Sequence, residues 1–182
     1  MPEMKYNMHF ICTRAEAKEL IRNNAELWIS KCWCREENQS GCERSRVDVC
    51  LGFTMEVTSL VSGVKKATYG DAIQLLVEAE EKHLVCRPFR DMKIKDKIDG
   101  ICFCCDDCCK YFLEEDGPCD KGNYIEQTNM EICTHCGVCV DVCFFKARKM
   151  TDGKLEVNNE NCYGCGLCFD VCPANCIQII KR

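Results

Sequence analysis

Two short runs with the same cysteine spacing lie 29 residues apart near the C-terminal end of the chain. The first is CTHCGVCVDVCF (residues 133–144) and the second is CYGCGLCFDVCP (residues 162–173). In each run, two residues separate the first three cysteines, and the fourth cysteine follows after three more. Aligning the runs also superposes Gly137 on Gly166. This repeat predicts a compact pseudo-symmetric unit, because neither copy could bury its own apolar face alone.

The spacing within each run favours iron–sulfur clusters over zinc. A C-x2-C-x2-C loop wraps around one centre, and the fourth cysteine of the run points towards the neighbouring cluster. Zinc sites more often use C-x2-C pairs that are separated by a longer spacer. The repeat therefore predicts two [4Fe–4S] clusters with crossed ligands, namely Cys133, Cys136, Cys139 and Cys172 for the first and Cys162, Cys165, Cys168 and Cys143 for the second.

These two runs resemble those of bacterial two-cluster ferredoxins, over residues 123–182. The resemblance implies a pseudo-symmetric βαβ fold and a role in electron transfer. This chain departs from the pattern at Phe144, which stands where the second copy has Pro173. Cys176 is an extra thiol in the second copy only, and we interpret it as a small buried side chain. His135 lies inside the first loop, where all three cysteines are present, so a hydrogen-bonding or surface role is expected.

Cysteine makes up 21 of the 182 residues, which exceeds the roughly 8–10 % typical of cysteine-dominated folds. The odd count excludes complete pairing in disulfides. The first twenty residues, MPEMKYNMHFICTRAEAKEL, contain no apolar core of a secretion signal. No apolar run approaches the length of a membrane span. We therefore expect a cytoplasmic metalloprotein, and the net charge of −5 argues against a nucleic-acid partner.

The first half of the chain contains two further cysteine-rich blocks, CWCREENQSGCERSRVDVC and CFCCDDCC. In an extended C-x-C segment both side chains point the same way and can face one metal, whereas the adjacent Cys104 and Cys105 point apart and suit different centres. Nine thiols predict a third [4Fe–4S] cluster, with a further cluster or a zinc ion as alternatives for the rest. The spacing leaves the pairing of these ligands open: Cys32, Cys34, Cys42, Cys50, Cys102, Cys104, Cys105, Cys108 and Cys109.

The pattern of apolar residues predicts an α+β protein with two domains. Residues 1–115 are expected to form a mostly helical cysteine-rich domain, residues 116–122 a linker rich in Gly and Pro, and residues 123–182 the ferredoxin-like domain. The first helix should begin with a capping box at Thr13 and Glu16 and extend through Trp28 to deliver Cys32 and Cys34. A second helix is expected from Ser45 to about Leu60, and a third with Asp71 as its N-cap. Asp152 and Gly153 predict a hairpin turn.

The chain lacks the motifs that enzymes of this size commonly carry. No G-x-G-x-x-G or Walker-type loop occurs, and only three histidines are available for acid–base chemistry. The cysteine blocks therefore indicate an electron-transfer subunit that contacts a catalytic redox subunit and other iron–sulfur or flavin electron donors in a hetero-oligomer. A free ferredoxin, an enzyme with an open iron site and a structural zinc–sulfur protein are the alternatives.

The paired N-terminal blocks, taken with the ferredoxin-like half, are similar to the small iron–sulfur subunit of class II, tungsten-dependent benzoyl-CoA reductase. This resemblance implies an anaerobic electron-relay subunit on a catalytic subunit that carries a tungsten pterin cofactor. The same blocks also suit another anaerobic complex, of the heterodisulfide-reductase-like or electron-bifurcating kind. The ferredoxin-like half resembles domains of many unrelated redox complexes, so it does not distinguish between these candidate complexes.

Overall fold

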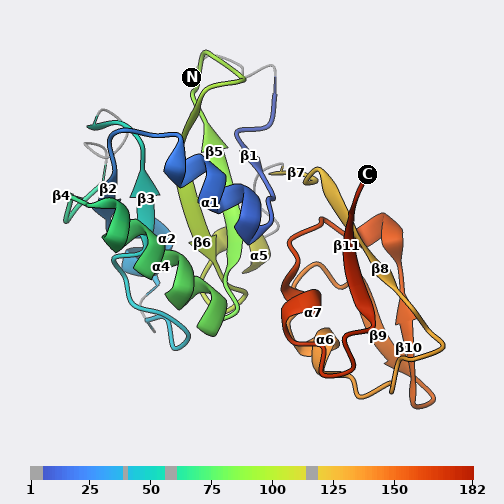
Figure 1. Cartoon of the computed structure of the whole chain (residues 1–182). Coiled ribbons are helices and arrows are strands. Elements are labelled where there is room, and N and C mark those ends of the chain that lie inside the picture. The colour runs from blue at the N-terminus through green and yellow to red at the C-terminus, as the bar shows by residue number, and fades with distance from the viewer. Residues whose placement is uncertain (1–5, 39–40, 56–60, 114–118) are drawn as a thin grey trace.

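The computed structural model describes residues 6–38, 41–55, 61–113 and 119–182. Its first half, up to residue 120, combines short helices with one sheet (Figure 1). The helices are α1 (Arg14–Arg22), α2 (Trp33–Glu37), α4 (Tyr69–Glu81) and α5 (Lys110–Leu113). The strands are β1 (His9–Phe10), β2 (Trp28–Ser30), β3 (Cys50–Gly52), β4 (Lys65–Lys66), β5 (Val85–Arg90), β6 (Ile98–Cys104) and β7 (Cys119–Asp120).

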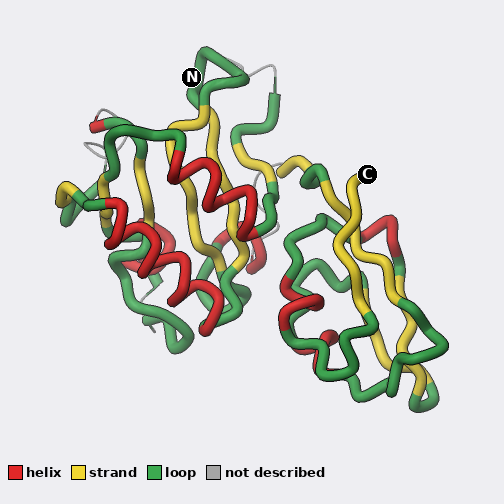
Figure 2. Tube along the Cα trace, viewed as in Figure 1, coloured by secondary structure: helices red, strands yellow, loops and turns green. Residues whose placement is uncertain are grey.

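These seven strands form one sheet in the order β4-β2-β3-β6-β5-β1-β7. Neighbouring strands are antiparallel, except that β7 runs parallel to β1. Helices α1 and α4 lie side by side across one face of the sheet (Figure 2). The main core fills the space between these helices and the sheet. Ile21 from α1 and Leu75 from α4 are buried in the same cluster as Leu51 and Ile101 from the sheet.

Capping boxes begin both of the longer helices. Thr13 caps α1 and its hydroxyl accepts a hydrogen bond from the backbone of Glu16, as the sequence predicts. In α4 the N-cap is Thr68 rather than Asp71, because Asp71 occupies the third helical position and its carboxylate accepts from the Thr68 backbone N–H. Among the residues described, no helix has both the length and the apolar character needed to cross a membrane.

The first half is less helical than expected, and the sheet is the reason. Trp28, predicted at the end of the first helix, lies in β2, and Cys50, predicted in the second helix, lies in β3. The segment around β3 alternates apolar and other residues, with Val49, Leu51 and Phe53 all buried. A period of two is the pattern of a half-buried strand. Residues 56–60 of the predicted second helix lie outside the described residues.

Strand β6 separates the core from the cysteine-rich face of the sheet. Successive side chains of a strand point to opposite faces. Ile101 and Phe103 join the core beneath the helices, whereas Cys102 and Cys104 line a cavity on the other side. The C-x-C spacing in this strand therefore directs both thiols the same way.

The second half contains two short antiparallel pairs and two one-turn helices. Strand β8 (Tyr124–Thr128) pairs with β11 (Ile177–Lys181), and β9 (Arg148–Thr151) pairs with β10 (Lys154–Val157). Asp152 and Gly153 form the turn between β9 and β10 in left-handed conformations, so the predicted hairpin is confirmed. A 3-10 turn (Asn159–Asn161) precedes the second run, and the two helices are α6 (Val138–Asp141) and α7 (Leu167–Asp170).

The two halves share a small apolar core. Ile11 and Val85 from the first half pack with Val142 and Leu167 from the second. Strand β7 lies within the expected linker, yet it pairs with β1 at the edge of the sheet, and residues 114–118 of that region are outside the described ranges. Gly122 permits a close approach, since a Cβ there would lie 2.5 Å from the carbonyl oxygen of Ile11. These contacts hold the cysteine-rich regions of both halves next to each other.

Candidate metal centres

The eight cysteines of the two runs line two small neighbouring cavities. One cavity, called cavity 1, brings Cys133, Cys136 and Cys139 of the first run together with Cys172 of the second. The other, called cavity 2, brings Cys162, Cys165 and Cys168 together with Cys143. The structure thus groups the thiols in the same two sets as the spacing does, and their role as cluster ligands stays a prediction.

Glycines shape both cysteine loops. Gly137 and Gly166 adopt left-handed conformations directly before α6 and α7, with φ of 81° and 88°. In this conformation glycine carries no steric penalty, unlike residues with a side chain. The loop therefore reverses sharply within the C-x2-C-x2-C segment, and its three thiols line one cavity.

A buried arginine connects the two cavities. The side chain of Arg148 is only 1 % exposed and forms an ion pair with Glu126, which is also buried. Its Nη1 lies 3.3 Å from the Sγ of Cys139 in cavity 1, while the residue itself lines cavity 2. Thr128 Oγ1 accepts from Nη2 at 2.9 Å. Nothing in the cysteine spacing pointed to Arg148, because its pairing with Glu126 depends on how β8 and β9 are placed.

Cys176 and His135, which are not among the predicted ligands, both lie near cavity 1. Cys176 is 4 % exposed and its Sγ is 3.4 Å from that of Cys172. His135 accepts a hydrogen bond at Nδ1 from the backbone N–H of Leu155, at 3.1 Å. That bond agrees with the expected hydrogen-bonding role and uses the ring nitrogen to anchor the first loop to β10.

Replacing Gly164 with alanine is expected to disrupt cavity 2. Gly164 has φ of +79°, and a Cβ would lie 1.9 Å from the carbonyl oxygen of Tyr124, so the backbone itself would have to move. We expect a loss of about 3 kcal/mol or more in unfolding free energy and a lower iron content of the purified protein. Gly166→Ala is the matched control. It has φ of +88° but no heavy atom within 4 Å of the added Cβ, so about 1 kcal/mol of backbone strain is expected. Equal losses in both variants, measured by thermal unfolding and iron analysis, would contradict this account.

The first half contains a much larger cavity, called cavity 3, of about 560 Å³. Seven of the nine candidate cysteines line it, namely Cys108 and six others. Each of these six thiols shifts the pKa of two of the others, so that neighbouring thiols make a closed ring. In order around the ring these are Cys32, Cys34, Cys109, Cys104, Cys102 and Cys50. The ring draws on both N-terminal blocks, which explains why neither block alone showed a complete ligand pattern.

Two buried cations stand beside this ring. Arg35 and Arg87 are 4 % and 7 % exposed and both line cavity 3. Arg35 Nη1 and Arg87 Nε are buried without a hydrogen-bond partner among the described residues. Interactions with Cys109 and Cys32 lower the pKa of the Cys34 thiol, whereas the pKa values of the other five ring thiols are raised by their neighbours and by burial. Unpaired buried donors facing a ring of thiols fit a negatively charged metal–sulfur group.

Aromatic rings fill the space between cavity 3 and cavity 2. Tyr111 lines cavity 3, and its ring centroid is 6.5 Å from that of Phe145. Phe145 stacks on Tyr163 with centroids 4.4 Å apart, and both line cavity 2. Phe112 contacts Phe144 and Phe145 edge to face. The three cavities therefore follow one another in the order 3, 2, 1, with aromatic rings at the first junction and Arg148 at the second.

The remaining three candidate cysteines meet away from this ring. Cys42, Cys105 and Cys108 gather with Asp107 on two adjoining loops, and only Cys108 also reaches the lining of cavity 3. Cys104 and Cys105 are thus directed to different groups, as expected for adjacent residues. Asp107, like Arg35 and Arg87, lay outside the sequence prediction, because a single carboxylate or guanidinium has no spacing pattern that marks it as part of a metal site.

Comparison with known proteins identifies part of the chain. Residues 132–176 match the model for the 4Fe–4S dicluster domain. No curated protein matches the chain. Residues 132–176 are therefore a ferredoxin-type iron–sulfur domain, which supports [4Fe–4S] clusters and iron–sulfur electron transfer. The matched segment covers only the cysteine runs and the residues between them, so the first half has no counterpart in this comparison.

Proposed function

We propose that this protein is an electron-transfer subunit that holds two [4Fe–4S] clusters in cavities 1 and 2. Cavity 1 uses Cys133, Cys136, Cys139 and Cys172, and cavity 2 uses Cys162, Cys165, Cys168 and Cys143. The grouping of these eight thiols in adjacent cavities inside the matched segment carries the proposal. Each cluster, when bound, exchanges one electron at a low potential. The chain supplies the thiolates, shields the centres with apolar side chains and places Arg148 between them.

Cavity 3 holds a third [4Fe–4S] cluster in this proposal. Four ligands suffice for one cluster, and the ring offers six thiols. Arg35 and Arg87 supply positive charge next to the ring, and Arg35 Nη1 and Arg87 Nε are buried donors without a partner among the described residues, which the sulfur atoms of a bound cluster would satisfy. The proposal is supported by this donor set and by the cavity's size. Two of the six cysteines then serve as neighbours that donate hydrogen bonds rather than as ligands.

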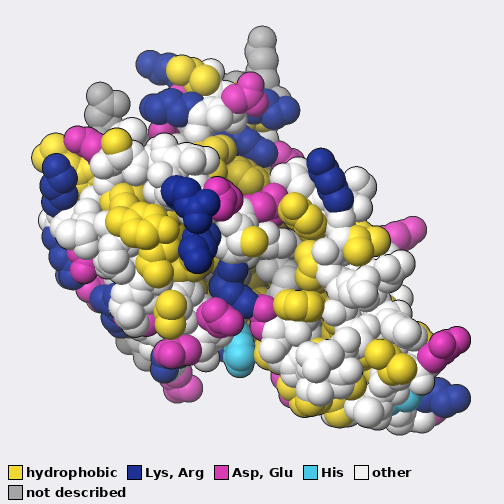
Figure 3. All heavy atoms as spheres, viewed as in Figure 1, with side chains coloured by type: hydrophobic (Ala, Val, Ile, Leu, Met, Phe, Trp, Pro, Cys, Tyr) yellow, Lys and Arg dark blue, Asp and Glu magenta, His cyan; other side chains and the backbone are white. Residues whose placement is uncertain are grey.

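A relay through three centres needs one partner at each end. Trp33, Met92 and Lys110 line cavity 3 in the first half, and Trp33 and Met92 are exposed. At the far end, Cys136 beside cavity 1 is exposed, and so are Met130, Ile132 and Val138. Figure 3 shows apolar side chains among charged ones on the surface of the second half. We therefore propose docking of an electron donor at one end and a catalytic redox subunit at the other, in a hetero-oligomer within a reducing compartment.

The resemblance to the small subunit of tungsten-dependent benzoyl-CoA reductase suggests the catalytic partner. In that case the partner carries a tungsten pterin cofactor, and this chain relays electrons to it. A heterodisulfide-reductase-like or electron-bifurcating partner would carry flavin instead. If the chain is a free ferredoxin, no partner will co-purify with it. Tungsten and flavin analysis of whatever co-purifies with the native chain distinguishes these outcomes.

Metal analysis of protein purified without air tests the relay. Three clusters predict about 12 iron and 12 sulfide per chain, a brown colour and, after reduction, paramagnetic signals from interacting clusters. A result of about 8 iron and 8 sulfide per chain would refute the cluster in cavity 3 and would still support the clusters in cavities 1 and 2. A colourless, iron-free protein would overturn the proposed function.

Exposure to air is expected to bleach the protein within hours and to promote aggregation. Thiolate ligands oxidise once a cluster is attacked, and each lost cluster removes folding free energy, as in other metal-dependent domains. The absorbance of the clusters in the visible range and light scattering, followed together, measure both effects. Unchanged absorbance over several days in air would contradict the expected access of oxygen.

A further inference from the structure

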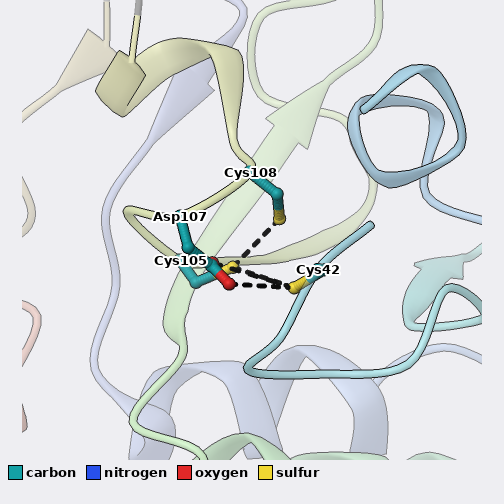
Figure 4. A group of neighbouring side chains, drawn as sticks. All are labelled: Cys42, Cys105, Asp107 and Cys108. Atoms are coloured by element: carbon teal, nitrogen blue, oxygen red, sulfur yellow. Dashed lines mark hydrogen bonds between the residues drawn. The ribbon is translucent and has the colours of Figure 1, made fainter. Parts of the chain in front are cut away.

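A second kind of metal site lies beside cavity 3. Cys42 comes from the loop that follows α2, whereas Cys105, Asp107 and Cys108 come from the turn between β6 and α5 (Figure 4). One donor atom from each of these four side chains lies within 4.8 Å of every other. The four side chains converge on one point, although they come from loops more than 60 residues apart.

The distances between the sulfurs fit one metal ion rather than a cluster. Cys42 Sγ lies 3.6 Å from Cys105 Sγ, which lies 3.1 Å from Cys108 Sγ. Two thiolates bound at about 2.3 Å to one tetrahedral zinc lie roughly 3.8 Å apart. Thiolates on different irons of a cube are farther apart, because a cube edge separates the atoms that they bind. Cys42 and Cys105 are thus spaced for a shared ion, and Cys105 and Cys108 lie closer still.

Asp107 completes a four-donor set. Its Oδ2 lies 3.5 Å from Cys42 Sγ and its Oδ1 lies 3.7 Å from the same sulfur. An oxygen and a sulfur on one tetrahedral zinc, bound at about 2.1 and 2.3 Å, lie roughly 3.6 Å apart. The backbone N–H of Arg44 donates to Oδ2 at 3.2 Å and holds the carboxylate in place. Cys105 and Cys108 also have the C-x2-C spacing that is common in zinc sites.

Arg35 provides independent support for thiolates at this site. Its guanidinium is buried, with Nε 3.2 Å from Cys42 Sγ and Nη2 3.3 Å from Cys105 Sγ. A guanidinium donates hydrogen bonds and accepts none, so both sulfurs act as acceptors here. Three thiolates and a carboxylate around a divalent ion carry a net charge of −2, which Arg35 partly neutralises. Such contacts from neighbouring side chains are usual around metal ligands.

We propose that Cys42, Cys105, Cys108 and Asp107 bind one zinc ion in a closed structural site that is distinct from the iron–sulfur clusters. The four protein donors leave no position for substrate. The ion links the loop between Cys34 and Cys50 to the turn between Cys104 and Cys109. The six thiols of the ring flank these two segments, so the zinc fixes the spacing of that ring.

Metal analysis and X-ray absorption on the full chain, purified without air, test the proposal. The expected result is one zinc per chain with about three sulfurs at 2.3 Å and one oxygen near 2.0 Å. Asp107→Asn should lower zinc affinity at least about tenfold in competition with a chromogenic chelator, while Asp106→Asn, the adjacent exposed aspartate, should leave it unchanged. Cys42→Ala should lose zinc and keep the iron of cavities 1 and 2, whereas Cys12→Ala, in the helix-side core, should keep both metals.

Cobalt provides a second readout that needs no folded apo-protein. Chains produced in cobalt-supplemented medium should show sulfur-to-cobalt absorbance and intense tetrahedral bands, which Cys42→Ala abolishes. Two outcomes would overturn the proposal: zinc-free wild-type protein whose iron content falls by about four in Cys42→Ala, or zinc that persists unchanged in both Cys42→Ala and Asp107→Asn. The first assigns these cysteines to a cluster, and the second places the zinc elsewhere.

Discussion

Replacing Cys139 with alanine is expected to remove one [4Fe–4S] cluster, so that iron falls by about four atoms per chain. Cys139 is buried and lines cavity 1 with the three other cysteines of its set. A C-x2-C-x2-C loop without its third thiolate leaves one iron without a protein ligand. The loss of the metal should also lower the stability of the second half, since metal binding contributes folding free energy in small domains of this kind. Iron and sulfide analysis, with thermal unfolding of the same samples, measures both effects.

Cys176→Ala is the matched control for that experiment. It is buried and lines the same cavity, and it makes the same chemical change, but it lies outside the proposed ligand set. Its iron content should equal that of the wild type. An unchanged iron content in Cys139→Ala, or an equal loss in Cys176→Ala, would refute the assignment of ligands in cavity 1.

Replacing Arg148 with methionine is expected to destabilise the second half and to lower the reduction potentials of its clusters. The change leaves the Glu126 carboxylate buried without its cation, which costs about 3–5 kcal/mol. The potentials fall because a nearby positive charge stabilises the reduced, more negative form of a cluster, and on the order of 1 kcal/mol or more per charge is lost at this range. Chemical denaturation and potentiometric titration followed by paramagnetic resonance measure the two effects.

A second substitution separates the two effects. Arg148→Met combined with Glu126→Gln removes the unpaired charge, so much of the stability should return, although a buried amide remains. Removing both charges should restore part of the potential as well, because the negative charge of Glu126 opposes that of Arg148. Lys149→Met is the control, since its side chain is 70 % exposed, and changes below about 0.5 kcal/mol are expected. Wild-type potentials in Arg148→Met would show that the guanidinium does not act on the clusters.

The cysteine runs of the second half predicted their own grouping because the constraint is local. Spacings of two and three residues fix which thiols share a loop, and the repeat itself predicted the crossed sets that line cavities 1 and 2. The turn at Asp152 and Gly153 was equally local. The first half was harder to predict, because Trp28 and Cys50 read as helical until their strands are paired across the sheet. The alternation of apolar residues from Val47 to Phe53 is the pattern of a strand, although a helix was predicted for this segment.

Sequence alone determined that this chain collects thiols for metal, that its second half holds two crossed sets, and that α1 begins at a capping box. Tertiary structure decided how the nine thiols of the first half divide into a ring of six and a group of three with Asp107. It also decided that the buried arginines Arg35, Arg87 and Arg148 lie beside these groups. The physical reason is distance along the chain. A loop of a few residues fixes its own ligands, whereas Cys42 meets Cys105 only after the sheet has brought two remote loops together.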